Sequence, residues 1–261
     1  IQHYQKALEV LTLQKHPDNW ANIQRNLAII YINRIKGKKE ENIEQAIEHY
    51  ILALNVYRRN DFPHQWAEIH ILLADANINR PDGGKTEKIE QAIQYCKLAL
   101  EVFKRDNFPH QWAKTHLILG NASKERSCGG KTENIERAIQ YYRQALEVYT
   151  RQAFPQEWAN IQICLARAQL DPALGRKPEN VNQAIVYLNH SLEVYTCHEF
   201  PEKSLEGAII LGDLACYVGN WELAKKAYDQ AISAKDVLMR TSFSYTDKAS
   251  YSQAIMPKGK L

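Results

Sequence analysis

Histidines and cysteines are the side chains of this 261-residue chain that could bind a metal ion or act as nucleophiles. His64 and His70 lie six residues apart, and the pair His110 and His116 repeats that spacing. Two metal ligands on one helix face are typically four residues apart, so these pairs do not indicate a metal site. We interpret them as helix-surface histidines that were copied by duplication.

The five cysteines are scattered along the chain, and no two of them form a CxxC motif. Free thiols are typical of a reducing cytoplasm, so we expect a cytoplasmic protein. A catalytic thiol requires a neighbouring base, and the sequence indicates none for Cys96, Cys164 or Cys216. We therefore expect no catalytic residue, no cofactor and no metal, and we predict that the chain is not an enzyme.

Two Gly-Gly-Lys-Thr-Glu strings, which begin at Gly83 and Gly129, combine glycine with lysine. A phosphate-binding loop has the form strand–GxxxxGK[ST]–helix, and neither string has it. A loop before a helix N-terminus could still hold an anion. A repeated surface turn is the interpretation that we prefer.

The composition excludes several classes of protein. Lysine and arginine number 33 against 30 aspartates and glutamates, and this net charge of +3 is too small to indicate nucleic-acid binding. No apolar run approaches the roughly 18 residues of a membrane span. Glycine (11) and proline (9) are scarce, which disfavours a loop-rich all-β fold or a disordered chain. The opening IQHYQKALEV reads as the middle of a helix, so we expect a piece of a longer polypeptide.

Several strings recur along the chain in one register. The string NIEQAI and its variants place Ala46, Ala92, Ala138 and Ala184 at a constant interval of 46 residues. An FPxxW-like string recurs at the same interval, beginning at Phe62, Phe108, Phe154 and Phe200, with a degenerate copy at His16. A string rich in glycine and lysine precedes each NIEQAI-like start. Independent strings in one register indicate a repeat protein.

Each repeat contains two helical patterns. Apolar residues recur three and four positions apart between Asn42 and Asn60, and a similar stripe runs through His64–Arg80. We expect Asn42 to cap the first helix with Gln45 in a capping-box position, and Pro63 to lie in the first turn of the second helix. One helical hairpin cannot bury both faces, so we predict stacked hairpins in an all-α solenoid.

The small and aromatic positions resemble the tetratricopeptide repeat, here extended to 46 residues. The small residue that the family places after leucine is matched by Gly120, and its alanine–aromatic–alanine pattern is matched by Ala138, Tyr142 and Ala145. The resemblance implies a right-handed α-solenoid in which alanine and glycine let paired helices approach closely. It also implies buried aromatics at equivalent positions, which are Tyr50, Tyr142 and Tyr228.

The resemblance implies an array over residues 1–238, made of a truncated helix at residues 1–15 and five helix pairs. Residues 239–261 are expected to form a capping helix or a linker. We expect Ala234–Ile255 to be helical and to pack on the fifth pair. Its apolar side chains would be Val237, Leu238, Phe243, Tyr245, Tyr251 and Ile255.

A narrower resemblance concerns the tandem strings as a whole. Copies of NIEQAIxxYxxALEVY and FPxxW joined by GGKTEN-like loops look like the repeat region of cyanobacterial tetratricopeptide proteins. Many of these carry a caspase-like protease domain of the CHAT type after the repeats. The resemblance implies a bacterial protein that could contact its own effector domain in a longer polypeptide.

The family resemblance also implies a binding surface. The helices that contain Leu27 and its equivalents would line the concave face, where an apolar centre lies between polar or charged flanks. We expect Arg25, Lys114 and Arg167 to flank one groove, and a merely solvated face is the alternative. The Lys–Asn pair with which some family members hold a C-terminal carboxylate is absent. The expected partner-binding residues are Asn22, Arg25, Ile29, Asn33, Glu68, Ile71, Asp75, Asn79, Lys114, Leu117, Asn121, Asn160, Ile163, Arg167, Glu206, Ile209 and Asp213.

These observations predict a non-enzymatic protein–protein interaction or scaffolding module. Its partner would be a peptide or a helix of another protein in the concave groove, and we expect no nucleic acid and no membrane as partner. The alternative is an intramolecular regulatory segment that controls a downstream effector domain of the caspase-like protease type, absent from this chain.

Overall fold

The computed structural model describes residues 1–80 and 85–254, without the side chains of residue 85 and residues 242–254. The described residues contain eleven α-helices, one short 3₁₀ helix and no strand. The chain divides into two compact units, Ile1–Tyr149 and Thr150–Leu261. The Gly-Gly pair of the first GGKTE string, at residues 83–84, lies outside the described residues.

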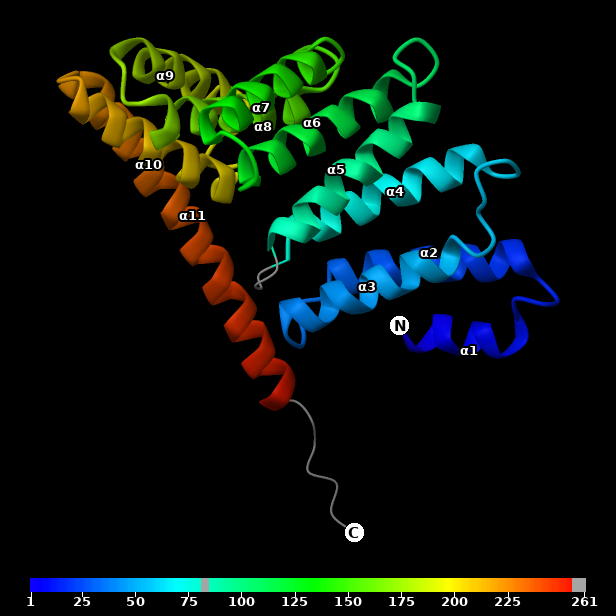
Figure 1. Cartoon of the computed structure of the whole chain (residues 1–261). Helices are drawn as coiled ribbons and strands as arrows, with labels where there is room; N and C mark the ends of the chain where they lie inside the picture. Colours follow the sequence, from blue (N-terminus) through cyan, green and yellow to red (C-terminus); the bar gives the residue numbers. More distant parts are fainter. Residues whose placement is uncertain (81–84, 255–261) are drawn as a thin grey trace. The chain divides into compact units, whose positions relative to one another are not determined.

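Figure 1 labels the helices in chain order. The first unit contains α1 (Gln2–Val10), α2 (Pro17–Ile32), α3 (Lys39–Ala53), α4 (Pro63–Ile78), α5 (Lys85–Val102), α6 (Pro109–Glu125) and α7 (Lys131–Leu146). The second unit contains α8 (Pro155–Gln169), η1 (Pro172–Leu174), α9 (Pro178–Leu192), α10 (Pro201–Tyr217) and α11 (Trp221–Ala254).

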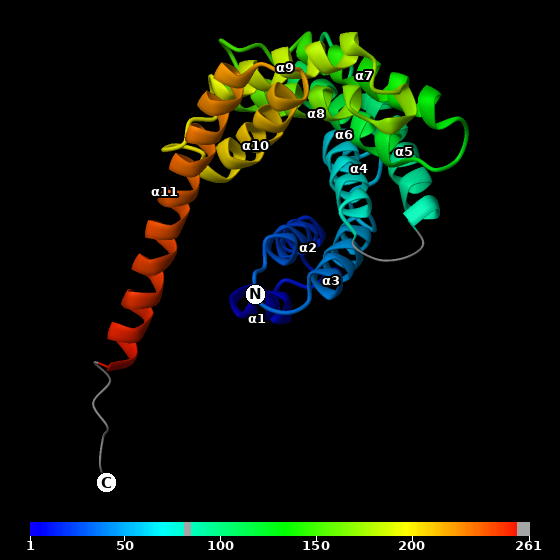
Figure 2. The same cartoon turned by 90° about the vertical axis from the view of Figure 1, so that its left-hand side faces the viewer.

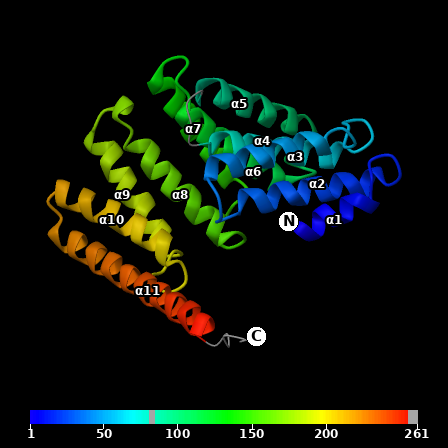
Figure 3. The same ribbon diagram turned by 90° about the horizontal axis from the view of Figure 1, so that it is seen from below.

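Consecutive helices pair as hairpins, which we number 1 to 5: α2–α3, α4–α5, α6–α7, α8–α9 and α10–α11. We call the first helix of each hairpin the A helix and the second the B helix. Figure 2 shows α2 beside α3 in the first unit, and Figure 3 shows α10 beside α11 in the second. Within each unit, neighbouring hairpins also pack on one another, α5 on α6 and α9 on α10. The predicted all-α solenoid is confirmed.

The FPxxW strings begin the A helices. Proline occupies the first turn of α2, α4, α6, α8 and α10, where its missing N–H leaves no bond unmade, so the expectation for Pro63 is confirmed. The preceding Phe62 has φ −134° and ψ 59°, which is not helical. Its carbonyl accepts the first helical hydrogen bond, from the Trp66 N–H at 2.9 Å.

Asn42 does not cap α3, so this expectation was wrong. The helix begins at Lys39, which places Asn42 inside the first turn with 5% of its surface exposed. Its side-chain amide donates to the carbonyl oxygens of Arg34 and Lys36 at 3.2 and 3.0 Å. The asparagine therefore holds the preceding loop against the helix, close to Gly37, whose φ of +89° favours glycine.

Small residues and aromatics pack as the resemblance implied. Tyr50 and Tyr142 are 2% and 0% exposed, so their predicted burial is confirmed. A Cβ added to Gly120 would lie 2.4 Å from Cε1 of Tyr142, which shows how closely α6 approaches α7. Tyr228 in hairpin 5 is only half-buried. Its hydroxyl donates to Asp213 Oδ1 at 2.7 Å.

The C-terminal segment extends α11 and does not form a separate helix. Residues 221–254 form one continuous helix, so the helical prediction is confirmed up to residue 254. Val237 and Leu238 are half-buried, and Leu238 lines a small pocket with Phe200 and Pro201 at the start of α10. The side chains of Phe243, Tyr245 and Tyr251, and all of Ile255, lie outside the described residues.

Three arginines at equivalent loop positions connect each loop with both helices of the next hairpin. The guanidinium carbons of Arg59, Arg105 and Arg151 lie 5.6, 5.7 and 5.7 Å from the ring centroids of Trp66, Trp112 and Trp158. Each arginine also pairs at 2.6 Å with a B-helix glutamate, Glu101, Glu147 and Glu193 respectively. These pairs are about half exposed, so each stabilises the fold by less than about 1 kcal/mol.

Candidate protein-binding surface

The expected partner-binding residues lie on the A helices and at their C-terminal ends, in both units. The first A-helix surface, on α2, α4 and α6, comprises Asn22, Arg25, Ile29, Asn33, Glu68, Ile71, Asp75, Asn79, Lys114, Leu117 and Asn121. The second A-helix surface, on α8 and α10, comprises Asn160, Ile163, Arg167, Glu206, Ile209 and Asp213.

An ion pair joins α2 to α4 on the first A-helix surface. Arg25 Nη1 donates to Glu68 Oε2 at 2.7 Å, and the two side chains are 26% and 38% exposed. The Nε atom of Arg25 is buried and has no hydrogen-bond partner within the described residues. Because each charge has its partner in the chain, neither is freely available to an external ligand.

Asp75 on α4 is a half-buried carboxylate in the middle of the same surface. Burial raises its pKa above the ordinary value, although the nearby Lys114 on α6 and a hydrogen bond from Asn79 oppose this shift. The Asn79 amide lies 3.2 Å from Asp75 Oδ1 and 2.9 Å from the Asp75 carbonyl oxygen. Lys114 itself is exposed.

In hairpins 3 and 5 the residue that follows the small position of the A helix accepts a hydrogen bond from a B-helix tyrosine. In hairpin 3 the Tyr142 hydroxyl donates to Asn121 Oδ1 at 2.9 Å. In hairpin 2 the equivalent of Tyr142 is Cys96, which is fully buried and has no hydroxyl group to offer Asp75. Burial, followed by the charge of Asp75, raises the pKa of the Cys96 thiol, so this cysteine stays protonated.

Two isoleucines of the expected set are not on the surface. Ile71 is 2% exposed and packs in a core cluster with Ile118 and Leu119 of the next A helix. Ile163 is 3% exposed and packs with Ala159 and Tyr195. The expectation that these two side chains contact a partner was therefore wrong, because other side chains of the core already cover them.

Other apolar members of the set remain accessible. Ile29 on α2 is 37% exposed and Ile209 on α10 is 43% exposed, whereas Leu117 on α6 is half-buried. Asn22 and Asn33 are exposed on either side of Ile29 along α2. The Asn33 side chain donates to the Ile29 carbonyl oxygen at 2.9 Å, which fixes its orientation at the end of the helix.

The second A-helix surface has its own charge pairing. Arg167 on α8 pairs with Glu206 on α10, and Asp213 accepts the hydroxyl hydrogen bond from Tyr228. Asn160 is half-buried. As on the first surface, opposite charges on successive A helices face one another.

This mutual pairing was not predicted from the sequence, although the repeat spacing gives a signal for it. Arg25 and Glu68 are 43 residues apart, and Arg167 and Glu206 are 39 apart, so both separations are close to the repeat length. In both pairs the two residues lie on adjacent A helices. The expected charged rim is therefore largely neutralised within the chain.

The repeated histidines differ from the expectation of a surface location. His70 and His116 are both 6% exposed, so that part of the interpretation was wrong. Each ring packs on the tryptophan of its own helix, with centroid distances of 4.2 and 4.1 Å. Burial lowers the pKa of both imidazoles, although a hydrogen bond to the tryptophan carbonyl opposes this shift.

Within residues whose side chains are described, no group of three histidine, cysteine, aspartate or glutamate side chains is arranged to hold a metal ion. Among the described helices, none is both long and apolar enough to cross a membrane.

Comparison with known proteins supports the repeat interpretation. A family model described as tetratricopeptide repeat matches residues 127–150, which include α7. The crystal structure of BtubC (BKLC) from P. vanneervenii is similar with a TM-score of 0.64 and 18% identity, over 90% of this chain and 87% of that chain. At that identity the likeness concerns the fold alone. No curated protein sequence matches the chain. Together, the repeat match and the structural likeness support a tetratricopeptide-repeat-like protein, and such repeats generally mediate protein–protein interaction or scaffolding.

Proposed function

We propose that the chain is a protein-interaction module whose first A-helix surface binds an extended peptide. The observation that carries this proposal is the exposure of Ile29 between the amide side chains of Asn22 and Asn33. The isoleucine can bury apolar area against a partner, and side-chain amides can hydrogen-bond with a peptide backbone. Such a surface requires no catalytic group.

The internal charge pairs define the kind of peptide. Arg25 is paired with Glu68, and Lys114 lies near Asp75, so the surface offers little net charge. A strongly charged peptide is therefore a poor ligand, and a peptide with apolar anchors is a better one. We expect its affinity to depend only weakly on ionic strength.

An effector domain of the same polypeptide, including one of the caspase-like type, would be a partner of the same kind. Its contact segment would compete with the external peptide for the first A-helix surface. The variant at Ile29 described next would weaken both interactions.

The test compares two exposed isoleucines of the first unit. Peptides are selected from a random displayed library on the wild-type chain, and their affinities are measured by calorimetry. Ile29→Glu should weaken binding by about tenfold or more, because it places a charge in the apolar centre of the surface. Ile51→Glu is the matched control, since Ile51 on the B helix α3 is 51% exposed. Binding that survives Ile29→Glu but is lost in Ile51→Glu would contradict the proposal.

A further inference from the structure

Three ring-bearing side chains pack on one another in hairpin 2, and three equivalent ones do so in hairpin 3. In hairpin 2, Trp66 packs on His70 with a centroid distance of 4.2 Å, and His70 packs on Tyr95 at 5.5 Å. In hairpin 3 the corresponding distances are 4.1 and 5.9 Å, among Trp112, His116 and Tyr141. Hairpins 1 and 4 keep large side chains at these positions, namely Trp20, Gln24 and His49, and Trp158, Gln162 and Tyr187.

Hairpin 5 has small residues at all three positions. The 46-residue register aligns Ser204 with the tryptophans and Ala208 with the histidines. Ala227, three residues after Ala224, aligns with Tyr95 and its equivalents. Cys197 also replaces the loop arginine that covers the tryptophan in hairpins 2 to 4.

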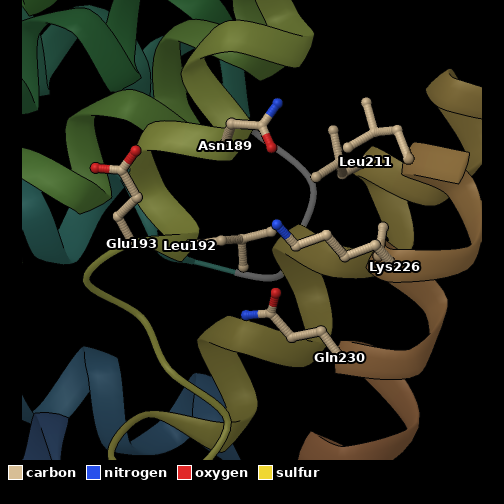
Figure 4. A pocket seen from close by; sticks show the side chains of 8 residues that line it. Asn189, Leu192, Glu193, Leu211, Lys226 and Gln230 are labelled. Carbon is tan, nitrogen blue, oxygen red and sulfur yellow. The ribbon is translucent and has the colours of Figure 1, made fainter.

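A pocket of about 280 Å³ lies beside one of these three positions, Ala227, whereas Ser204 and Ala208 are buried and do not line it. Ala227 forms part of its wall, and Gln230 donates to Ser204 Oγ at 3.1 Å. Figure 4 shows Lys226 extending from α11 toward Leu192 of α9, with the amide groups of Asn189 and Gln230 on either side. The complete lining is Asn189, Leu192, Glu193, Leu211, Leu223, Lys226, Ala227 and Gln230.

The pocket retains a cation suited to an aromatic ring. Glu193 is already paired with Arg151 at 2.6 Å, whereas Lys226 makes no ion pair within the described residues. A tryptophan ring in this pocket would meet the Lys226 ammonium group, much as Trp158 meets the guanidinium group of Arg151 at 5.7 Å. The leucines of the wall supply the apolar contact.

A second feature of the same hairpin provides an occupant. Trp221, in the first turn of α11, is 70% exposed, the largest exposed fraction among aromatic side chains that the structure describes. The residues at the equivalent position of the other B helices are at most 3% exposed, and they are Ile43, Ile89, Ile135 and Val181. Trp221 therefore projects from a position that is core elsewhere in the chain.

Trp221 cannot fill the pocket of its own copy. At 100° per residue, Trp221 lies on the face of α11 opposite the pocket-lining Leu223, Ala227 and Gln230. Val218, in the turn before α11, is 43% exposed and adds apolar area beside the tryptophan. An exposed tryptophan and an open pocket thus occur in one hairpin but face different directions.

We propose that Trp221 of one copy of this chain inserts into the hairpin 5 pocket of a second copy. The contact is head-to-tail, because each copy offers one tryptophan and one pocket on different faces. Such a heterologous contact does not close on itself unless the rotation between copies allows a ring. Association therefore continues beyond the dimer as the protein concentration rises.

The experiment is sedimentation velocity of the full chain over a range of concentrations. The average mass of the wild type should rise with concentration, whereas Trp221→Ala and the pocket-filling Ala227→Tyr variant should each remain monomeric. An equimolar mixture of the two variants should form dimers and nothing larger, because only one intact tryptophan–pocket pair is possible. Lys226→Gln should weaken wild-type association about threefold.

Two controls distinguish this contact from non-specific association and from misfolding. Ile35→Ala, at a side chain that is 98% exposed, should associate like the wild type. If Ala227→Tyr prevents folding, Ala227→Leu serves as the filled variant. A wild type that stays monomeric at about 1 mM would overturn the proposal. So would undiminished association of Trp221→Ala, or a variant mixture that stays monomeric.

Discussion

Gly120 lies so close to Tyr142 that a methyl group at residue 120 would meet the tyrosine ring at 2.4 Å. The ring cannot simply move aside, because its hydroxyl donates to Asn121 Oδ1 at 2.9 Å and the side chain is fully buried. Hairpin 1 has Ala28 and Tyr50 at these positions, but there Ile29 replaces the hydrogen-bonding asparagine. The close approach of α6 and α7 thus depends on a glycine and a fixed tyrosine together.

The first prediction follows from this contact. Gly120→Ala should lower the free energy of unfolding by about 1–3 kcal/mol, because the added methyl group overpacks the interface. Urea denaturation of the variant and the wild type measures the change. Gly175→Ala is not a suitable control because Gly175 has a φ of +71°, so the control is Gln14→Ala in an exposed loop. An unchanged denaturation midpoint for Gly120→Ala would mean that the two helices are not held this closely in solution.

The second prediction concerns Arg25 and Glu68. Arg25→Glu should destabilise the fold, because it places a second carboxylate opposite Glu68 and removes the 2.7 Å pair. The exchanged double variant Arg25→Glu/Glu68→Arg should recover much of the loss, and thermal melts of the single and double variants provide the measurement. Reversal of an unpaired surface charge would instead leave the melting curve nearly intact. Equal melting temperatures for wild type and Arg25→Glu would show that the pair does not form.

The third prediction concerns pH and Asp75. Burial raises the pKa of this carboxyl above its ordinary value of 3.8, so the folded chain binds the proton more tightly than the unfolded chain. Its contribution is therefore most favourable below about pH 4 and is lost as the pH rises through the folded pKa. Asp75→Asn should be more stable than the wild type at pH 7, and the difference should shrink at low pH. A variant less stable than the wild type at pH 7 would mean that Lys114 outweighs the cost of burial.

The fourth prediction concerns His116, whose effect on stability changes with pH in the opposite direction to that of Asp75. Burial lowers the pKa of His116 below its ordinary value of 6.5, so the unfolded chain binds more protons. The stability contributed by the neutral ring is present above pH 6.5 and is lost as the pH falls toward the folded pKa. His116→Gln, which copies the glutamine at the equivalent position 162, should lose less stability between pH 7 and pH 5 than the wild type. Parallel stability profiles would indicate that His116 titrates normally in the fold.

The repeat register made the fold predictable, because one interval related the alanines, the FPxxW strings and the apolar stripes. It placed the A-helix prolines and the buried Tyr50 and Tyr142 correctly. The N-terminus of α3 was misplaced, since asparagine serves equally well as a cap and as a loop anchor. Only the folded structure shows that the Asn42 side-chain amide donates to the carbonyl oxygens of residues 34 and 36, which precede it in the chain.

The candidate surface was less predictable, because helical spacing gives the direction of a side chain but not what covers it. Ile71 and Ile209 occupy equivalent positions, yet the first is 2% exposed and the second 43%. The next A helix covers Ile71, whereas α10 has no further A helix beside it in the described residues. The pairing of Arg25 with Glu68 could have been found by aligning charges at the repeat interval.

The most direct test of the proposed function is a methyl NMR spectrum of the isoleucine side chains. It is recorded with and without a peptide selected on the wild-type chain. The account predicts that the Ile29 methyl signals shift on binding, while those of the exposed Ile51 on α3 and the buried Ile69 on α4 stay in place. Shifts confined to Ile51, with Ile29 unchanged, would contradict the assignment of the binding surface to the A helices.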